Sequence, residues 1–346
     1  MDFLVSLTIC RKGHNMKYRT LGKTGLKVSE VGLGGNTFAA PRLNKEQSIV
    51  CIQQAQELGV NFIDTANIYG AGESEENIGK AIKGQREQWV IGTKFNFWQQ
   101  PENESIDGHI QRQCHESLAN LNTDYIDLYQ LHAPEVDVDM VPVLESLQTL
   151  IKQGKVREIG VCNMSAWRHA QTMCMAQTNA LPELVSIQNH YNLLRRHVEL
   201  ETLPYCEKEN VGFLPYFPLA GGFLTDKYTK GEAAPDGTRG AAGSPIVRHS
   251  RSVRNEEIQH QLKTWANDQG HTLNELAIAW LLSRQSVSSV IAGVSSVKQV
   301  KANVKGSAWT LTQEQVETVD GLAAWDGTDD AIELLQDFSK EVRFAK

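Results

Sequence analysis

Three short apolar runs in the chain each end at one ionisable side chain, respectively Asp64, Lys94 and His132. A phenol, Tyr69, follows Asp64 by five residues and immediately precedes Gly70. These four groups suit proton transfer to a carbonyl. An ammonium beside a phenol favours the phenolate and lowers its pKa, a carboxylate keeps the ammonium charged, and an imidazole can orient a carbonyl group.

The elements that must position these side chains repeat along the chain. Segments with apolar residues at helical spacing alternate with eight apolar runs of strand type. The runs cover residues 31–34, 60–64, 89–94, 125–132, 158–161, 184–188, 211–215 and 287–292. This alternation predicts parallel strands with right-handed crossovers, and eight units favour a closed (β/α)8 TIM barrel of the α/β class. The polar strand ends would then meet at one face of the barrel.

Both ends of the chain carry additions to this pattern. Residues 17–29 contain two glycines and short alternating runs, which predict a β-hairpin at the bottom of the barrel. Residues 1–15 are expected to be a disordered N-terminal extension, and residues 16–346 a single barrel domain. Helical spacing after residue 309, around residues 316–322 and 332–335, predicts additional C-terminal helices.

Composition narrows the classes of function. The chain has 346 residues and 34 basic against 41 acidic side chains, a net charge of −7. This balance argues against nucleic acid or an anionic membrane as the main partner. The six cysteines are scattered and form no C-x-x-C pair or Cys/His cluster at metal-ligand spacing. We therefore expect no metal site, reduced thiols and a cytoplasmic protein.

The four reactive residues lie in motifs that closely resemble those of the aldo-keto reductases. The motifs are Ile63-Asp64-Thr65-Ala66 with Tyr69-Gly70, then Thr93-Lys94, then Leu131-His132. The resemblance continues through residues 16–35, 160–163, 188–192 and 215–224. It implies that Asp64, Tyr69, Lys94 and His132 form a catalytic tetrad. Taken singly, each of these residues has an ordinary structural explanation, and only their joint order and spacing indicate catalysis.

A nicotinamide cofactor is implied by the resemblance. The glycine cluster at residues 32–37 lacks the third glycine of the Rossmann fingerprint. The resemblance instead places the cofactor across the barrel mouth, where Asn163 and Gln188 would hydrogen-bond the carboxamide and Tyr216 would stack on the nicotinamide ring. The remaining contacts would come from the pyrophosphate loop and the terminal cofactor motif, at Leu219, Gly221, Gly222, Leu224, Gly293, Ser295, Ser296, Gln299 and Asn303.

Two positions depart from the family pattern. Phe217 stands where the family commonly has serine, and Gln299 where many members have an arginine that faces the 2′-phosphate. Ser295, Ser296 and Lys298 could still bind that phosphate, so NADP(H) is predicted and NAD(H) stays possible. The segment at residues 218–254 has six glycines and six basic residues. It is interpreted as a mobile cover over a phosphate-bearing ligand, with a solvated insertion as the alternative.

The function that the resemblance implies is hydride transfer between NADP(H) and the carbonyl or alcohol of a small aldehyde, ketone or sugar. Tyr69 would act as general acid and base, and His132 would orient the carbonyl. An apolar substrate pocket could be lined by four aromatic residues, which could equally be packing residues: Phe38, Phe97, Trp98 and Tyr191.

Two other functions remain open. The chain could be a cofactor-sensing regulatory subunit that resembles potassium-channel β subunits, since such subunits can keep an intact tetrad. It could also be a Schiff-base aldolase that uses Lys94 at the end of its strand. The sequence predicts neither the substrate nor the oligomeric state.

Overall fold

The computed structural model describes residues 16–98, 100–133 and 138–324. Its central element is a closed barrel of eight parallel strands in the order β10-β3-β4-β5-β6-β7-β8-β9. The strands are β3 (Val31–Gly34), β4 (Phe62–Asp64), β5 (Val90–Phe95), β6 (Ile126–Leu131), β7 (Val156–Cys162), β8 (Ser186–His190), β9 (Gly212–Tyr216) and β10 (Val290–Gly293). The predicted TIM barrel is confirmed.

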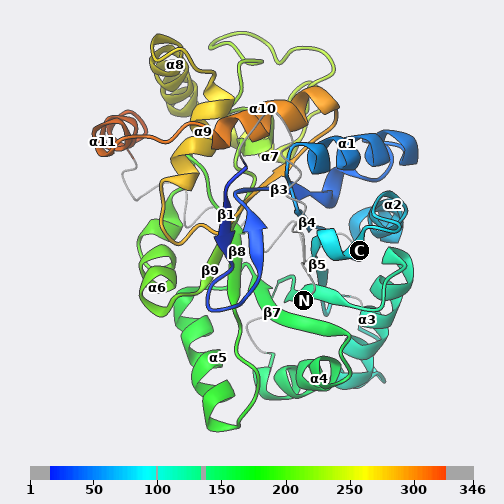
Figure 1. The fold of residues 1–346 in the computed structure, drawn as a ribbon. Coiled ribbons are helices and arrows are strands. Elements are labelled where there is room, and N and C mark those ends of the chain that lie inside the picture. Colours follow the sequence, from blue (N-terminus) through cyan, green and yellow to red (C-terminus); the bar gives the residue numbers. More distant parts are fainter. Residues whose placement is uncertain (1–15, 99, 134–137, 325–346) are drawn as a thin grey trace, which may run out of the picture.

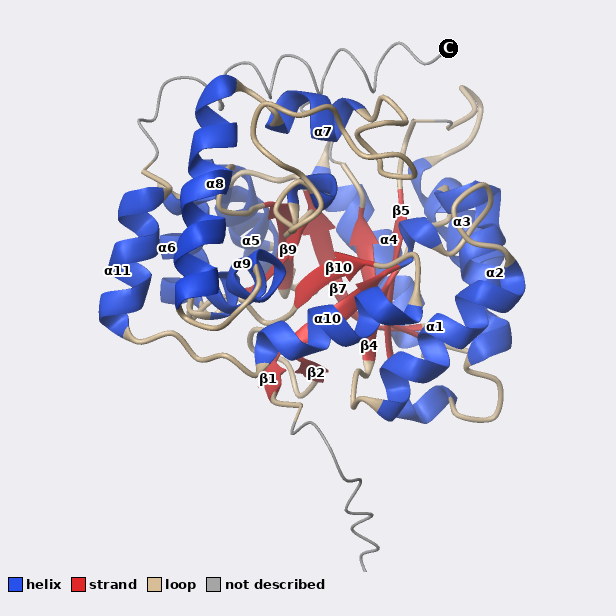
Figure 2. Ribbon diagram, turned by 90° about the horizontal axis from the view of Figure 1, so that it is seen from above, coloured by secondary structure: helices blue, strands red, loops and turns tan. Residues whose placement is uncertain are grey.

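Helices surround the barrel and connect its strands (Figures 1 and 2). Those that follow the strands in turn are α1 (Lys45–Glu57), α2 (Glu73–Ala81), α3 (Ile106–Leu121), α4 (Met140–Lys152), α5 (Ala166–Thr178), α6 (Thr202–Glu209), α9 (Leu273–Leu282) and α10 (Val297–Ser307). Three more are α7 (Pro245–Ser250), α8 (Val253–Asp268) and α11 (Gln313–Leu322). The predictions for residues 1–15 and 332–335 lie outside the described residues.

Local sequence signals explain where helix α3 begins and ends. The Ser105 side chain accepts a hydrogen bond from the Gly108 amide, which satisfies one of the free amides of the first turn. At the other end Asn122 has a φ of 49°, in the left-handed region where asparagine is tolerated after a helix. The helix therefore has defined limits on both sides.

The hairpin of β1 (Tyr18–Thr20) and β2 (Lys27–Ser29) is antiparallel, as predicted. Its buried Leu21 and Val28 pack against side chains from inside the barrel, including Phe62 and Val90 at the first positions of β4 and β5. Because these are the positions where the strands begin, the hairpin closes the N-terminal end of the barrel. The opposite end carries the polar residues.

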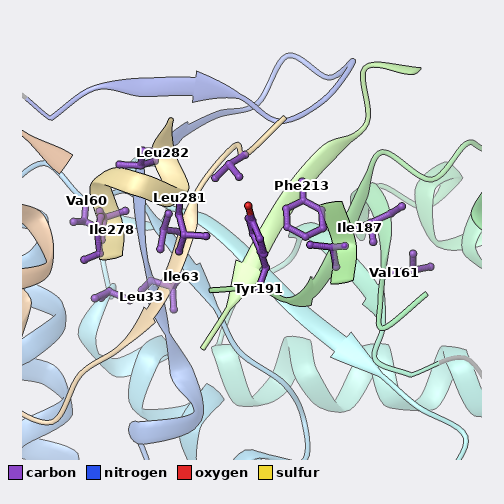
Figure 3. Packing of buried hydrophobic residues seen from close by; sticks show 14 of the residues in the cluster. Leu33, Val60, Ile63, Val161, Ile187, Tyr191, Phe213, Ile278, Leu281 and Leu282 are labelled. Carbon is purple, nitrogen blue, oxygen red and sulfur yellow. The ribbon is translucent and has the colours of Figure 1, made fainter. Parts of the chain in front are cut away.

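The main hydrophobic core lies between the strands and the surrounding helices. Figure 3 shows part of it, with Leu33 and Ile63 from strands and Ile278 and Leu281 from α9. This layer fixes the strands against their helices and so determines where their C-terminal ends stand. None of the helices in the described ranges combines enough length and apolar character to cross a membrane.

The long segment between β9 and α8 packs onto the barrel. Phe223, Leu224 and Tyr228 from its first half are buried, as is Val247 of α7. The Tyr228 hydroxyl accepts a hydrogen bond from the Gly240 amide, which ties two parts of the segment together. The first part of the segment and α7 are therefore packed against the rest of the protein, whereas most residues between 229 and 246 are exposed.

Candidate active site

Asp64 and Lys94 form a buried ion pair at the C-terminal end of the barrel. Lys94 Nζ donates to Asp64 Oδ2 at 2.6 Å and to the Thr65 carbonyl oxygen at 2.6 Å. The two residues are 3% and 0% exposed. They come together because β4 and β5 are neighbours, with Asp64 level with Gly92 in the register. The pairing matches the role that the sequence predicts for the carboxylate, which is to hold the lysine in place.

The second oxygen of Asp64 is held by two amides. Gln130 Nε2 and Gln188 Nε2 donate to Asp64 Oδ1 at 2.9 Å and 2.8 Å. Gln188 was predicted to contact a cofactor, and its side-chain nitrogen is used here within the protein. Gln130 was missed by the sequence analysis, although it stands directly before the last residue of β6. The available signal was a polar side chain near the C-terminal end of a fully buried strand.

The electrostatics of this pair keep Lys94 charged. Burial lowers the pKa of the Lys94 ammonium, but the Asp64 carboxylate, together with Tyr69 and Cys162, more than offsets this, so the pKa lies above its ordinary value. A Schiff-base lysine must be able to lose its proton before it attacks a carbonyl. The environment of Lys94 therefore argues against the aldolase alternative.

Tyr69 lies beside this ion pair in a short 3-10 helix, η2 (Tyr69–Gly72). Lys94 Nζ is 5.3 Å from the centroid of the phenol ring. The next residue, Gly70, has a φ of 60°, and a Cβ atom there would lie 2.4 Å from the Ala39 Cβ. Only glycine combines this backbone conformation with such close approach, so Gly70 allows the tyrosine loop to pack against the loop that follows β3.

The pKa of the Tyr69 phenol is raised, which corrects the expectation of a lowered value. Burial raises it, the Lys94 ammonium opposes this, and the Asp64 carboxylate raises it again. The sequence could show the ammonium but not the desolvation of the phenol. A raised pKa keeps the phenol protonated near neutral pH, which is the state that a proton donor requires.

His132 completes the group next to Tyr69. The two rings are edge to face, with centroids 5.8 Å apart and planes at 81°. Burial, together with the Lys94 charge, holds the pKa of His132 well below its ordinary value, so the imidazole is neutral. Its Nδ1 atom is buried and makes no hydrogen bond within the described structure. The structure thus brings all four predicted residues to one end of the barrel.

Two predicted cofactor residues lie against the same group. Asn163 Nδ2 donates to the His132 carbonyl oxygen at 3.0 Å, and its Oδ1 accepts from the Tyr216 hydroxyl at 2.7 Å. The His190 ring stacks on Tyr216, with centroids 5.3 Å apart and planes at 22°. Phe217 has a φ of 51°, and its ring contacts the Tyr216 ring edge to face, with centroids 5.2 Å apart. Side chains at the C-terminal ends of β7, β8 and β9 are therefore in contact with one another.

The predicted cofactor motif after β10 begins helix α10. Ser296 is the N-cap, and its hydroxyl accepts from the Gln299 amide at 3.3 Å. The Gln299 side-chain oxygen accepts from the Ser295 amide at 2.8 Å. Gln299 therefore closes this turn. Further along the helix, the Asn303 Nδ2 atom is buried and has no hydrogen-bond partner in the described part of the chain.

The long segment brings a cation to the end of β10. A Cβ atom at Gly293 would lie 3.9 Å from Nη2 of Arg239. Burial, together with the nearby Arg42 charge, lowers the pKa of the Arg239 guanidinium to about 10, so it remains charged at neutral pH. Within the described ranges this guanidinium has no hydrogen-bond or ion-pair partner. Its position agrees with a cover that faces an anionic group.

The four aromatic candidates divide into two groups. Phe38 and Tyr191 are fully buried in the main core, in which Figure 3 shows Tyr191. The Tyr191 hydroxyl donates to Glu199 at 2.6 Å. These two are packing residues. Phe97 and Trp98 follow β5, and the Trp98 ring lies 5.3 Å from the His132 ring at 39°. Trp98 is 36% exposed, so part of its ring is accessible beside the imidazole.

Comparison with known proteins gives a consistent result. The model of the aldo/keto reductase family matches residues 30–324. An aldo-keto reductase of Alternaria alternata is 31% identical, over 90% of this chain and 93% of that protein. Versiconal hemiacetal acetate reductase of Aspergillus parasiticus is 30% identical, over 87% of this chain and 95% of that protein.

A protein of Arabidopsis thaliana named as a probable voltage-gated potassium channel subunit beta is 33% identical, over 84% of this chain and 90% of that protein. The family match thus extends from the loop before β3 to the end of α11. It includes every strand of the barrel and all four residues of the buried group. On these grounds the chain belongs to the aldo/keto reductase family.

Proposed function

We propose that this protein uses NADPH to reduce the carbonyl group of small aldehydes, ketones or sugars, with Tyr69 as the general acid. The observation that carries this proposal is the arrangement of a protonated phenol and a neutral imidazole against a buried, charged lysine. Its membership of the aldo/keto reductase family supports the same reaction class.

Each group in the site has a separate task. When bound, a reduced nicotinamide supplies the hydride. Tyr69 donates its proton to the oxygen of the carbonyl, and the Lys94 ammonium stabilises the phenolate that remains. His132 donates a hydrogen bond to the same oxygen, and this requires a neutral ring that carries one proton. Asp64 holds Lys94 and keeps it charged.

Two observations support a place for the cofactor beside β10 and α10. The buried Asn303 amide has an unused donor, and the Arg239 guanidinium is unpaired near Gly293 among the described residues. Both could be satisfied by a nucleotide, through its base and its phosphate. Asn163, Gln188 and Tyr216 would hold the nicotinamide end.

A preference for NADPH over NADH follows from the charge at this end of the site. Gln299 carries no guanidinium for the 2′-phosphate, and its side-chain oxygen already accepts from the Ser295 amide. Arg239 can take over part of that role, because a guanidinium binds phosphate in a bidentate manner. Lys298 and the hydroxyls of Ser295 and Ser296 would add weaker contacts.

The test is a panel of aldehydes, ketones, sugars and alcohols, assayed with NADPH and with NADH. The proposal expects turnover of at least one carbonyl compound, with a larger kcat/KM for NADPH than for NADH. The absence of turnover with every carbonyl in the panel would reject the reductase assignment. A kcat/KM for NADH equal to or above that for NADPH would reject the cofactor preference alone.

A second candidate is a cofactor-sensing regulatory subunit. It is favoured by the similarity to the Arabidopsis thaliana protein named as a probable channel subunit. This candidate expects NADPH binding with very slow turnover, together with a stable complex with a potassium channel. Rapid multiple turnover without any channel in the assay would decide in favour of the enzyme.

A further inference from the structure

We propose that Gln113 of helix α3 is a positioning residue, which fixes the loop of Tyr69 against the loop of Trp98 and thereby sets the efficiency of carbonyl reduction. This inference rests on the proposed reductase function. Gln113 does not belong to the apolar stripe of its helix, and it is nevertheless buried, with 4% of its surface exposed. Its amide makes contacts to both loops.

The first contact is to the residue that follows β5. Gln113 Oε1 accepts from the Asn96 amide at 3.2 Å, and Gln113 Nε2 donates to the Asn96 carbonyl oxygen at 2.7 Å. One side-chain amide thus pairs with both backbone groups of Asn96, much as a neighbouring strand would. This double pairing sets the orientation of the Gln113 amide and fixes the point where the chain leaves β5.

The second contact is to the loop of the phenol. Asn67 Nδ2 donates to Gln113 Oε1 at 2.5 Å. Asn67 lies between Asp64 and Tyr69, two residues before the tyrosine. The same oxygen of Gln113 therefore holds the two loops that follow β4 and β5.

The network continues from Asn96 to the aromatic residue beside the imidazole. The Asn96 side-chain oxygen accepts from the Trp98 amide at 3.1 Å. Since the Trp98 ring lies 5.3 Å from the His132 ring, the position of Asn96 also determines how this indole stands over the site. Gln113 is consequently linked to the proton donor through Asn67 and to the surroundings of His132 through Asn96.

A histidine one helical turn earlier supports the same loop. His109 Nε2 lies 2.8 Å from the Asn96 carbonyl oxygen, and His109 Nδ1 lies 2.5 Å from Glu104. The His109 ring also stacks on Phe97, with centroids 5.7 Å apart. The segment after β5 is therefore held along helix α3 over more than one residue. Gln113 extends this support to the tyrosine loop through Asn67, whose Oδ1 also accepts from Asn96 Nδ2 at 3.4 Å.

Such positioning matters because proton transfer depends steeply on geometry. A displacement of about 1 Å in a reacting group can reduce the rate by about 100-fold. Both loops follow neighbouring strands of the barrel, and one side chain of helix α3 contacts them both. Gln113 therefore fixes the position of both loops relative to helix α3 and to each other.

The experiment compares Gln113→Glu and Gln113→Leu with the wild type. Glutamate keeps the shape and the acceptor but removes the donor to the Asn96 carbonyl, and leucine removes both. Gln111→Leu is the matched control, because Gln111 lies on the same helix and its nitrogen contacts Asp107 and Ser146 instead. Each protein is assayed with a reactive aldehyde at saturating NADPH, and its NADPH Kd is measured by fluorescence titration.

We expect both Gln113 variants to lose about 10- to 100-fold in kcat/KM, since the loops are displaced while the tetrad is intact. The NADPH Kd should stay within about twofold of the wild-type value and Gln111→Leu should match the wild type, because neither change touches the predicted cofactor residues. Asn67→Ala should also lower kcat/KM. In the Gln113→Leu background its effect should be smaller than in the wild type, because the contact between Asn67 and Gln113 is already lost and only the longer contact of Asn67 Oδ1 with Asn96 Nδ2, at 3.4 Å, remains.

The outcomes separate the two proposals. A wild-type protein without carbonyl turnover would reject the reductase function and this inference with it. An active wild type, with Gln113 variants that melt at a lower temperature but keep their kcat/KM, would overturn the positioning role alone. Additive effects of Asn67→Ala and Gln113→Leu would also overturn it.

Discussion

The buried ion pair between Asp64 and Lys94 predicts a large loss of stability for the isosteric change Asp64→Asn. In the native protein Lys94 Nζ is fully buried and has a carboxylate 2.6 Å away. Removal of one partner from a buried ion pair leaves the other charge uncompensated and typically costs about 3–5 kcal/mol. We expect a loss in this range in the free energy of unfolding.

The hydrogen bonds around the carboxylate support the upper part of that range. Asp64 accepts from Lys94, Gln130 and Gln188. An asparagine at this position has one acceptor oxygen and a new donor, so at least one of these three donors loses its partner. A buried donor without a partner costs about 1–3 kcal/mol. The Thr65 carbonyl oxygen remains as an acceptor for Lys94 and limits the total.

Urea denaturation of four proteins measures this effect: the wild type, Asp64→Asn, Lys94→Met and the double variant. Since Lys94→Met leaves Asp64 without its counter-ion, each single change should be costly. The double variant leaves no unpaired charge, so its cost should be well below the sum of the two single costs. A loss below about 1 kcal/mol in Asp64→Asn, or simple additivity, would refute the reasoning.

Three further predictions concern activity, cofactor choice and pH. Lys94→Met should lower kcat by at least about 100-fold in a steady-state assay, because the phenolate loses its ammonium; a kcat near the wild-type value would contradict this role. Arg239→Met should weaken NADPH binding by about 10- to 100-fold in fluorescence titration and should weaken NADH binding less. The exposed control Arg248→Met should leave the binding of both cofactors unchanged. Equal losses of NADPH and NADH binding in Arg239→Met would contradict the phosphate contact. The free energy of unfolding should fall in acid. Burial lowers the folded-state pKa of four histidines: His132, His169, His190 and His197. The unfolded chain takes up protons at these residues near pH 6.5 while the folded protein does not, so acid favours the unfolded chain. The free energy of unfolding should decline from pH 6.5 down to about 4, where His169 and His197 titrate in the folded state, and urea curves that are unchanged between pH 7.5 and 5 would exclude this.

The strands and the four reactive residues could be predicted because each leaves a local signal in the sequence. An apolar run that stops at a polar side chain marks both a strand and the end of the barrel at which it terminates. The run at residues 31–34 coincides with β3, and the run at residues 89–94 with β5 to within one residue. The family motif then supplied the roles of the residues at those ends.

Other features depend on contacts between distant parts of the chain. The pKa of Tyr69 is raised because the fold buries the phenol, and no spacing in the sequence measures burial. Gln113 binds the backbone atoms of Asn96, whose identity as partners follows from the register of α3 against β5. Tyr191 is an aromatic residue of the kind that lines substrate pockets, yet in the fold its side chain is buried in the core. These features need the three-dimensional arrangement.

The central claim is that Tyr69 is the general acid, and Tyr69→Phe tests it most directly. This change removes the phenolic proton and keeps the ring, so cofactor binding should be nearly unchanged in a fluorescence titration with NADPH. General acid catalysis is typically worth about 10²- to 10⁴-fold, and kcat for a reactive aldehyde should fall by at least that order. If Tyr69→Phe keeps more than about a tenth of the wild-type kcat under conditions where the chemical step limits the rate, another group must supply the proton.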